Sequence, residues 1–140
     1  MIKDNTRTIM IIDDDEDDRD FFCLAIRKIN SNAKIVCCTS GEDAIDYFES
    51  TELTIPDFIF LDLKMPKMDG KETICRLNKI KRAKDCPVII YSTTRSTTDE
   101  AEAKESGACF FLTKPYRFKD LVDSVSSIMK MLDITVANHS

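Results

Sequence analysis

The fold is decided by the stretch Phe58-Ile59-Phe60-Leu61-Asp62-Leu63-Lys64-Met65-Pro66-Lys67-Met68-Asp69-Gly70. Four apolar residues in a row end in a carboxylate, and a loop that carries a proline and a glycine follows. A short continuous apolar run between such breakers is typical of a strand buried on both faces of a parallel sheet. Asp62 is then expected at the carboxyl end of a central strand, the edge at which open α/β sheets bind ligands.

The rest of the chain repeats this pattern. Apolar runs predict four more strands, at residues 8–12, 34–38, 87–91 and 109–112. A first helix is predicted at 16–29, and a second begins after an N-cap at Ser40. A third runs from Gly70 and, with Ile80 as its last apolar residue, finishes in the basic stretch 79–82. The fourth is predicted at 98–106 and the fifth from Phe118 to Leu132. Five strands alternating with five helices predict one doubly wound α/β domain with a five-stranded parallel sheet.

Composition limits the functional classes. The chain has 140 residues and a net charge of −5 with acids and bases mixed, which disfavours a general nucleic-acid binder. No apolar segment approaches the roughly 20 residues that span a bilayer, and residues 1–7 lack the apolar core of a signal peptide. We therefore expect a cytoplasmic protein without a membrane partner.

Six cysteines occur without a Cys-x-x-Cys spacing, and in an unexported chain we expect reduced thiols. Those in predicted helices and strands, namely Cys23, Cys37, Cys75 and Cys109, are interpreted as small buried hydrophobic residues. A metal site built from them is disfavoured, because the single histidine, His139, lies in the terminal segment.

Four of the five predicted strands are followed by a side chain with useful chemistry. These side chains are Asp13 and Asp14, Asp62, Ser92, and Lys114. The carboxyl ends of parallel strands meet at one edge, so we expect them in one crevice. The acids that follow at positions 16–18 are interpreted instead as partners of a helix dipole.

The chemistry of this set follows from its charges. Three neighbouring carboxylates repel one another, and a divalent cation relieves the repulsion; an all-oxygen site that keeps several waters suits Mg²⁺. The Lys114 ammonium and the Ser92 hydroxyl can bind anionic oxygens. Together they suit a phosphoryl group, which Asp62 could accept as an acyl phosphate.

The sequence resembles the response-regulator receiver domains (CheY-like) of bacterial two-component signalling. The resemblance covers about residues 8–131 and rests on Ile12-Asp13-Asp14, Leu61 to Gly70, Tyr91-Ser92-Thr93 and Lys114-Pro115. It implies a flavodoxin-like sheet of strand order 2-1-3-4-5. The expected organisation is an N-terminal extension at 1–7, a receiver domain at 8–132 and a tail at 133–140, without an output domain.

The resemblance also implies roles for individual residues. Asp62 is expected to be the phosphoacceptor, and Mg²⁺ (with Mn²⁺ able to substitute) to be held by Asp13, Asp14, Asp62 and the backbone carbonyl of Lys64. Phosphoryl binding is expected from Ser92, Thr93 and Lys114. Switching is expected from Ser92 and Phe111, and tuning of dephosphorylation from Lys64 and Thr94.

A receiver of this kind takes its phosphoryl group from a sensor histidine kinase or a histidine phosphotransfer protein. It then signals to a downstream protein through the face formed by helix 98–106, the fifth strand and the last helix, a face that can also pair two copies. We expect no nucleic-acid contact and no enzyme activity beyond self-phosphorylation and autodephosphorylation.

Three alternatives stay open at this point. A degenerate receiver would bind partners without phosphorylation, although the full set of acids, hydroxyl and lysine argues against it. A Mg²⁺-dependent phosphohydrolase commonly carries a second acid two residues after the nucleophile, where this chain has Lys64. A flavodoxin-like cofactor binder needs a phosphate-cradling loop after the first strand, where this chain has six acids.

Overall fold

The computed structural model describes the backbone of residues 6–139 and the side chains of residues 6–133. Its strands are β1 (Thr8–Ile12), β2 (Lys34–Cys38), β3 (Phe58–Leu61), β4 (Val88–Ser92) and β5 (Phe110–Thr113). All neighbours pair in parallel, in the order β2-β1-β3-β4-β5. The predicted parallel sheet and its strand order are therefore confirmed.

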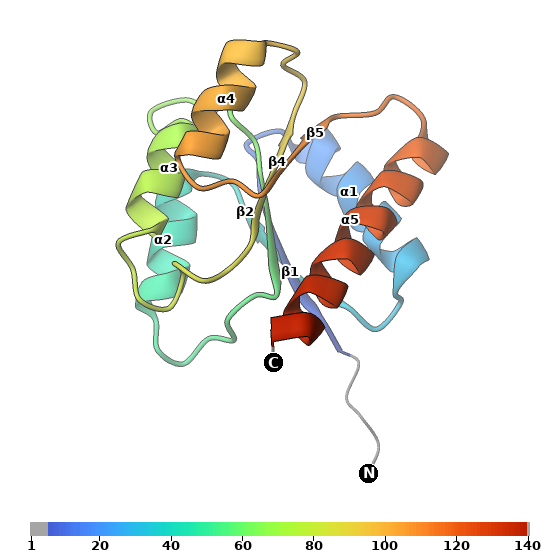
Figure 1. Cartoon of the computed structure of the whole chain (residues 1–140), viewed down its shortest axis with the longest axis horizontal. Helices are drawn as coiled ribbons and strands as arrows, with labels where there is room; N and C mark the ends of the chain where they lie inside the picture. Colours follow the sequence, from blue (N-terminus) through green and yellow to red (C-terminus); the bar gives the residue numbers. More distant parts are fainter. Residues whose placement is uncertain (1–5, 140) are drawn as a thin grey trace.

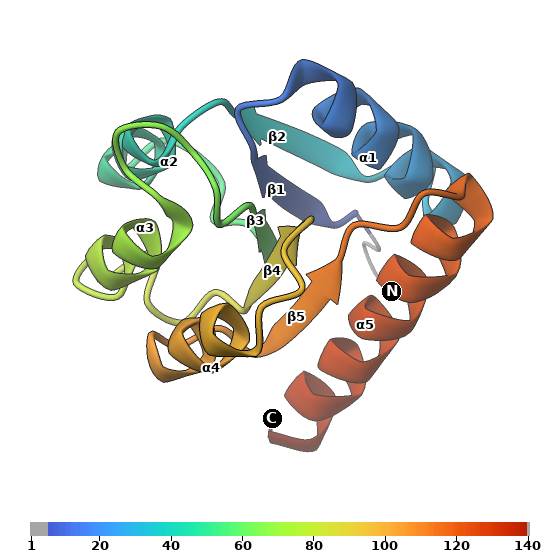
Figure 2. The same ribbon diagram turned by 90° about the horizontal axis from the view of Figure 1, so that it is seen from above.

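Helices follow each strand and cover both faces of the sheet. They are α1 (Glu16–Ile29), α2 (Gly41–Glu49), α3 (Gly70–Leu77), α4 (Thr97–Glu105) and α5 (Phe118–His139). Figure 2 shows α1 and α5 on one face and α2, α3 and α4 on the other, and Figure 1 shows the same division from the side. None of the helices in the described part of the chain is long and apolar enough to cross a membrane.

The central strands are apolar throughout because they contact helices on both faces. Every residue of β1, β3 and β4 is buried, and alternate side chains enter two separate cores. On the side of α1 and α5, the ring of Phe22 packs against Phe60 and Tyr91, with centroids 4.8 and 5.5 Å apart. The rigid layer so formed fixes the direction of the residues that follow each strand.

Two helix ends differ from the sequence predictions. Helix α3 ends at Leu77, and the basic residues 79–82 lie in turns beyond it; Ile80 maintains the apolar spacing because it still packs on the core from a turn. Helix α5 continues to His139, past the predicted helix end at Leu132 and through most of the segment 133–140 that was expected to be a tail. Most of the predicted N-terminal extension, residues 1–5, lies outside the described residues.

The cysteine interpretation was wrong in its main part. Cys37, Cys75 and Cys109 are exposed, Cys23 is half-buried, and Cys38 is the fully buried one. Strand β2 is an edge strand, so its residues are covered less completely than those of central strands. A cysteine in a strand or helix is therefore not buried by that fact alone.

Candidate functional site

The strand ends do converge, and backbone hydrogen bonds fix their positions. The amide of Asp62 donates to the carbonyl of Ile12 at 2.9 Å, which continues the β1–β3 pairing past the end of β3. In the same way the Lys114 amide donates to the Ser92 carbonyl at 2.8 Å beyond β5. The side chains predicted from strand ends are thus attached to the hydrogen-bonded ends of buried central strands and of β5.

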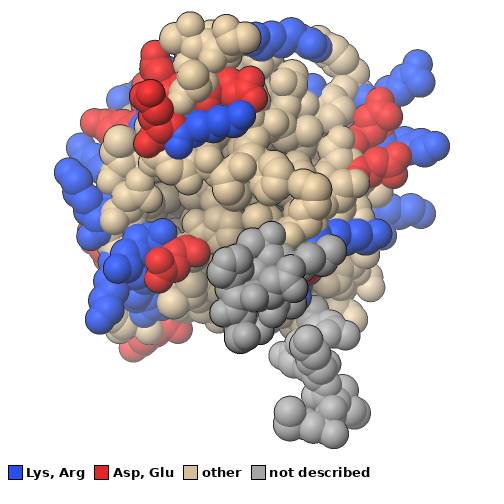
Figure 3. Space-filling model, viewed as in Figure 1, with Lys and Arg blue, Asp and Glu red and all other residues tan. Residues whose placement is uncertain are grey.

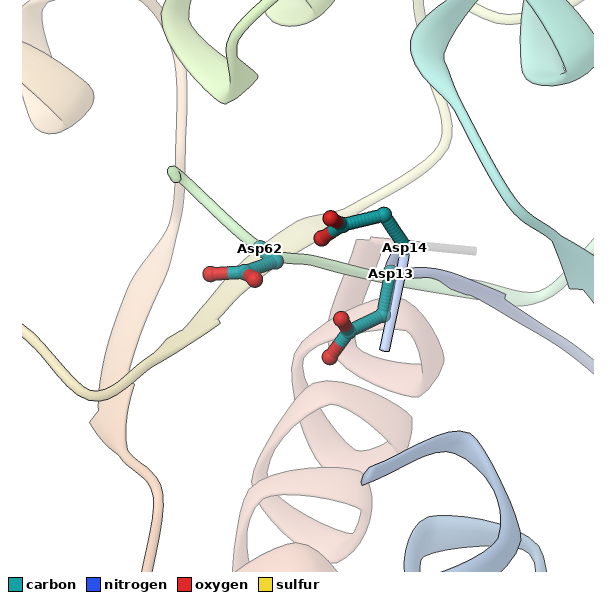
Figure 4. Close-up of side chains that lie close together, drawn as sticks. All are labelled: Asp13, Asp14 and Asp62. Carbon is teal, nitrogen blue, oxygen red and sulfur yellow. The ribbon is translucent and has the colours of Figure 1, made fainter. Parts of the chain in front are cut away.

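Three carboxylates gather where β1 and β3 end (Figure 4). Asp13, Asp14 and Asp62 each offer an oxygen within 4.8 Å of the other two. Asp13 and Asp62 are buried while Asp14 is exposed, so the cluster has a closed side and a side open to solvent. Burial raises the pKa of Asp13 to about 6, and the nearby charge of Asp62 acts in the same direction.

The ammonium of Lys114 lies at the centre of this negative charge. Its Nζ atom is 2.7 Å from Oδ2 of Asp13, 2.7 Å from Oδ2 of Asp18 and 3.5 Å from Oδ2 of Asp62. Burial by itself would lower the pKa of this amine, but the hydrogen bonds to Asp13 and Asp18, together with the negative charges of Asp62 and Asp13, outweigh it, and the pKa is raised. Lys114 is therefore held charged in the unmodified protein.

Asp18 was missed by the sequence analysis. It lies in the first turn of α1, where a carboxylate is already accounted for by the helix dipole, and the N-cap of that helix is Asp15. The structure brings its carboxylate to Lys114, whereas the neighbouring Glu16 and Asp17 are exposed. No sequence signal separates these three acids, because the difference depends on where the chain after β5 passes α1.

The residues after β4 and within β5 form the other wall. Ser92 is fully buried, and its hydroxyl oxygen accepts a 3.5 Å hydrogen bond from the Thr94 amide. Thr93 is exposed and lines a small cavity of about 120 Å³ together with Asp18 and Lys114. Phe111 is half-buried and packs against the core on the α4 side. Its ring therefore lies neither fully in the core nor fully in solvent.

The loop from Leu63 to Asp69 bends tightly back onto Asp62. The Lys64 amide donates to Oδ1 of Asp62 at 3.3 Å, and the Gly70 amide donates to the Leu63 carbonyl at 3.0 Å. A Cβ atom on Gly70 would lie 2.5 Å from the Asp62 carbonyl oxygen. Glycine is therefore required at position 70, because the backbone of the loop passes too close for a side chain. Asp69 caps α3, since its side chain accepts a hydrogen bond from the Glu72 amide at 2.9 Å.

Lys64 and Thr94, predicted as tuning residues, meet at a third residue that the sequence did not single out. The Thr94 hydroxyl donates to Oδ2 of Asp99 at 3.0 Å, and Nζ of Lys64 lies 3.3 Å from the same oxygen. Asp99 belongs to the first turn of α4, where an acid is again accounted for by the helix dipole.

The donor set fits a small divalent cation. All three side chains are carboxylates, one of them faces solvent, and their mutual repulsion is only partly balanced by Lys114. Oxygen ligands with room for several waters are typical of Mg²⁺ and also suit Mn²⁺. The residues present therefore could hold such an ion.

Known proteins share this fold and part of this sequence. A probable methanogenesis regulatory protein, FilR2, from Methanothrix harundinacea is 27% identical over 123 residues, which cover 86% of this chain and 79% of that protein. The phosphorylated cyanobacterial phytochrome response regulator RcpA shares the fold, with a TM-score of 0.82 at 23% identity over 93% of this chain and 96% of that one. The Mn²⁺-bound form of response regulator Rcp1 matches with a TM-score of 0.75 at 24% identity, covering 87% and 91%.

The family model described as the response regulator receiver domain matches residues 9–126. That range includes β2 to β5 in full, β1 from its second residue on, and each of the site residues discussed above. The acidic pocket of Asp13, Asp14 and Asp62 fits the phosphoacceptor site of such domains. The chain therefore belongs to the receiver domains of two-component response regulators.

Proposed function

We propose that Asp62 accepts a phosphoryl group from a phosphohistidine, presented by a sensor histidine kinase or a histidine phosphotransfer protein. The observation that carries this proposal is the position of Asp62, which lies 3.5 Å from the Lys114 ammonium and within reach of two further carboxylates. A carboxylate oxygen of Asp62 forms the new P–O bond. The P–N bond to the imidazole breaks, and the ring nitrogen leaves with the electron pair.

Each group of the site has a separate task in this proposal. Asp13, Asp14 and Asp62, with the Lys64 backbone carbonyl, would hold Mg²⁺, which when bound neutralises charge on the transferring group. Lys114 pairs with one phosphoryl oxygen, because it is already held charged beside Asp62. Ser92 donates its hydroxyl to another oxygen, and Thr93 supplies contacts at the exposed rim.

The output follows from the same contacts. A phosphoryl group would draw the Ser92 hydroxyl inward, and the half-buried Phe111 ring would occupy the space so released. This shifts the population of conformers of the face formed by α4, β5 and α5. Figure 3 shows that the centre of this face carries few charged side chains, which suits a downstream protein or a second copy of the chain.

Lys64 and Thr94 are proposed to set the rate at which water hydrolyses the acyl phosphate. In this proposal the chain is a switch that catalyses only its own phosphorylation and dephosphorylation. The receiver domain occupies residues 8–132, and a cytoplasmic location belongs to the same proposal, since it rests on family membership. A degenerate, phosphorylation-independent receiver and a phosphohydrolase are not favoured, because the complete acid, hydroxyl and lysine set is assembled on one sheet edge.

The proposal is tested by incubation with Mg²⁺ and phosphoramidate, followed by intact-mass spectrometry. We expect one phosphoryl adduct, which is lost in Asp62→Asn and kept in Asp123→Asn, a variant that changes an exposed acid on α5 outside the site. Removal of Mg²⁺ by a chelator should also abolish it. The absence of any adduct would support the degenerate receiver, and steady turnover of phosphoramidate without an adduct would support the phosphohydrolase.

A further inference from the structure

Asp99 joins four separate segments of the chain around the site. Its Oδ2 atom binds Lys64, from the loop after β3, and Thr94, from the loop after β4. Its Oδ1 atom lies 3.1 Å from Nζ of Lys71, on α3. Its own amide donates to the hydroxyl of Ser96, the N-cap of α4, at 3.1 Å. Side-chain exposure of Asp99 is 15%, so this cluster is partly shielded from water.

Helix α4 has little apolar contact to hold it in place. Ala103 is its one buried residue, so few apolar contacts attach it to the sheet. Figure 3 shows acidic and basic side chains side by side over this helix. The Thr94 amide in turn donates to the buried Ser92 hydroxyl. A continuous set of polar contacts therefore runs from Ser92 through Thr94 and Asp99 to α4.

We propose that Asp99 is a positioning residue that sets the lifetime of the aspartyl phosphate through Lys64 and Thr94. It keeps the Lys64 ammonium and the Thr94 hydroxyl paired at α4, so that they do not cover the phosphoryl oxygens on Asp62. Water then reaches the acyl phosphate. When a neutral side chain replaces Asp99, the Lys64 ammonium is free to pair with the phosphoryl group and slows hydrolysis. This inference rests on the function proposed above for Asp62.

The test compares phosphoryl lifetimes after the phosphodonor is removed. Asp99→Asn keeps the shape of the side chain, and we expect it to lengthen the lifetime about two- to fivefold, the size of one partly exposed ion pair. In a Lys64→Ala/Thr94→Ala background the same change should have no effect. Glu102→Gln is the matched control, because it removes a charge one turn later that pairs with Lys71 but not with Lys64. Thermal unfolding of each variant checks that it is folded.

The possible outcomes distinguish the positioning role of Asp99 from the phosphoacceptor role of Asp62. An unchanged lifetime in Asp99→Asn, with normal labelling of the unaltered protein, overturns the positioning role and leaves the phosphoacceptor intact. A lifetime change of equal size in the Lys64→Ala/Thr94→Ala background also overturns it, because the effect would then be structural. If the unaltered protein takes up no phosphoryl group, the proposed function fails, and this inference fails with it.

A second, independent observation concerns two cysteines on the α1 side of the sheet. The Sγ atom of Cys23, on α1, lies 3.8 Å from the Sγ atom of Cys37, on β2. Cys37 is exposed and Cys23 half-buried, so the pair is open to small molecules in solution. The neighbouring Cys38 is buried, and its carbonyl accepts a 3.0 Å hydrogen bond from the Asp13 amide. At a separation of 3.8 Å, the thiols of Cys23 and Cys37 are close enough to react with each other, and they lie beside the end of β1.

We infer that Cys23 and Cys37 form a modification site for low-molecular-weight disulfides such as oxidised glutathione. The exposed Cys37 thiolate attacks one sulfur of the external disulfide and releases a thiolate. The Cys23 thiolate then attacks the Cys37 sulfur and releases the second one. One external disulfide becomes two thiols, and the chain gains a covalent bond between α1 and β2. Burial, together with Cys37, raises the pKa of the Cys23 thiol to about 11, which makes Cys37 the first to react.

Oxidised glutathione and intact-mass spectrometry test this site. We expect the loss of two hydrogen atoms and, after digestion without reductant, a peptide pair linked through Cys23 and Cys37. Cys23→Ser should instead keep a glutathione adduct on Cys37, whereas Cys75→Ser, at an exposed cysteine on α3, should form the link normally. Adducts on Cys37 in the unaltered protein without a linked peptide pair would overturn the assignment.

Discussion

The Lys114 ammonium lies 2.7 Å from Oδ2 of Asp13, and it joins the end of β5 to the end of β1 across 101 residues of sequence. Both side chains are almost completely shielded, with exposures of 8% and 0%. The same ammonium is only 3.5 Å from Asp62. In the unmodified protein these carboxylates thus hold in place the Lys114 ammonium, the group that is proposed to bind the phosphoryl group.

This pair makes a prediction for stability. Lys114→Met keeps much of the side-chain volume but leaves Asp13, Asp18 and Asp62 without their common partner. We expect the free energy of unfolding at pH 7.5 to fall by about 2 kcal/mol, the size of lost hydrogen bonds to a charged group. Urea unfolding measures it, and added Mg²⁺ should restore more stability to the variant than to the unaltered protein.

A matched control is available on α4. Lys104 pairs with Glu100 at 3.4 Å, but both side chains are largely exposed. Lys104→Met should therefore change the unfolding free energy by no more than about 0.5 kcal/mol. Equal losses in the two lysine variants would mean that the strand-end site adds nothing to stability.

A metal prediction follows from the open side of the acid cluster. Mg²⁺ should raise the melting temperature by mass action, since the unfolded chain does not hold three carboxylates together. Asp14→Asn should remove most of that rise, with little effect on the metal-free protein because Asp14 is exposed. Asp17→Asn removes the same charge from an exposed position in the first turn of α1 and should keep the rise. A full Mg²⁺ response in Asp14→Asn would contradict the ligand assignment.

The sequence was sufficient to predict the sheet and the residues directly after its strands. Apolar runs of four or five residues without alternation, bounded by turn residues, are typical of buried parallel strands in a chain of this size. The parallel order then brought Asp13, Asp62 and Lys114 to one edge. The structure confirms that these residues lie close together, whereas their roles in phosphoryl transfer stay predictions.

The residues missed have a common physical reason. Asp18 and Asp99 both lie in first turns of helices, where the helix dipole is a sufficient local reason for an acid. Their tertiary partners, Lys114 and Lys64, come from loops whose paths cannot be read from hydrophobic spacing. The exposure of Cys37 depends likewise on β2 being at the edge of the sheet. Local patterns therefore predicted elements well and contacts between helix ends and loops poorly.

For Gly70 we predict a change in stability opposite in sign to the one that helix propensity alone would give. Replacing a helical glycine by alanine usually stabilises a protein by about 0.5–1 kcal/mol. Here the new Cβ would lie 2.5 Å from the Asp62 carbonyl oxygen and 2.7 Å from the Leu63 Cα atom. Because these are backbone atoms, the loop must move, and we expect Gly70→Ala to cost about 1–3 kcal/mol and to slow labelling of Asp62. A stabilised, normally labelled variant would contradict the close approach.

The N-terminal end of α2 gives a prediction for how stability changes at acidic pH. Asp43 accepts hydrogen bonds from the Thr39 hydroxyl at 2.6 Å and the Thr39 amide at 3.1 Å, and these lower the pKa of its carboxyl group. Because the folded-state pKa lies below the unfolded value, ionised Asp43 contributes stability above about pH 4. That contribution disappears as the pH falls through the folded-state pKa. Asp43→Asn should therefore be less stable than the unaltered protein near pH 7, and the difference should close in acid.

Urea unfolding at a series of pH values between neutral and strongly acidic measures this difference. Asp46→Asn is the matched control, because it removes an exposed acid from the same helix and leaves the Thr39 hydrogen bonds intact. Its difference from the unaltered protein should not follow the same course in acid. If the Asp43→Asn difference were instead constant over the whole range, the two Thr39 hydrogen bonds would favour the neutral carboxyl group as much as the charged one. The cap of α2 would then owe its stability to Ser40, whose hydroxyl oxygen accepts from the Asp43 amide at 3.1 Å whatever the charge of residue 43.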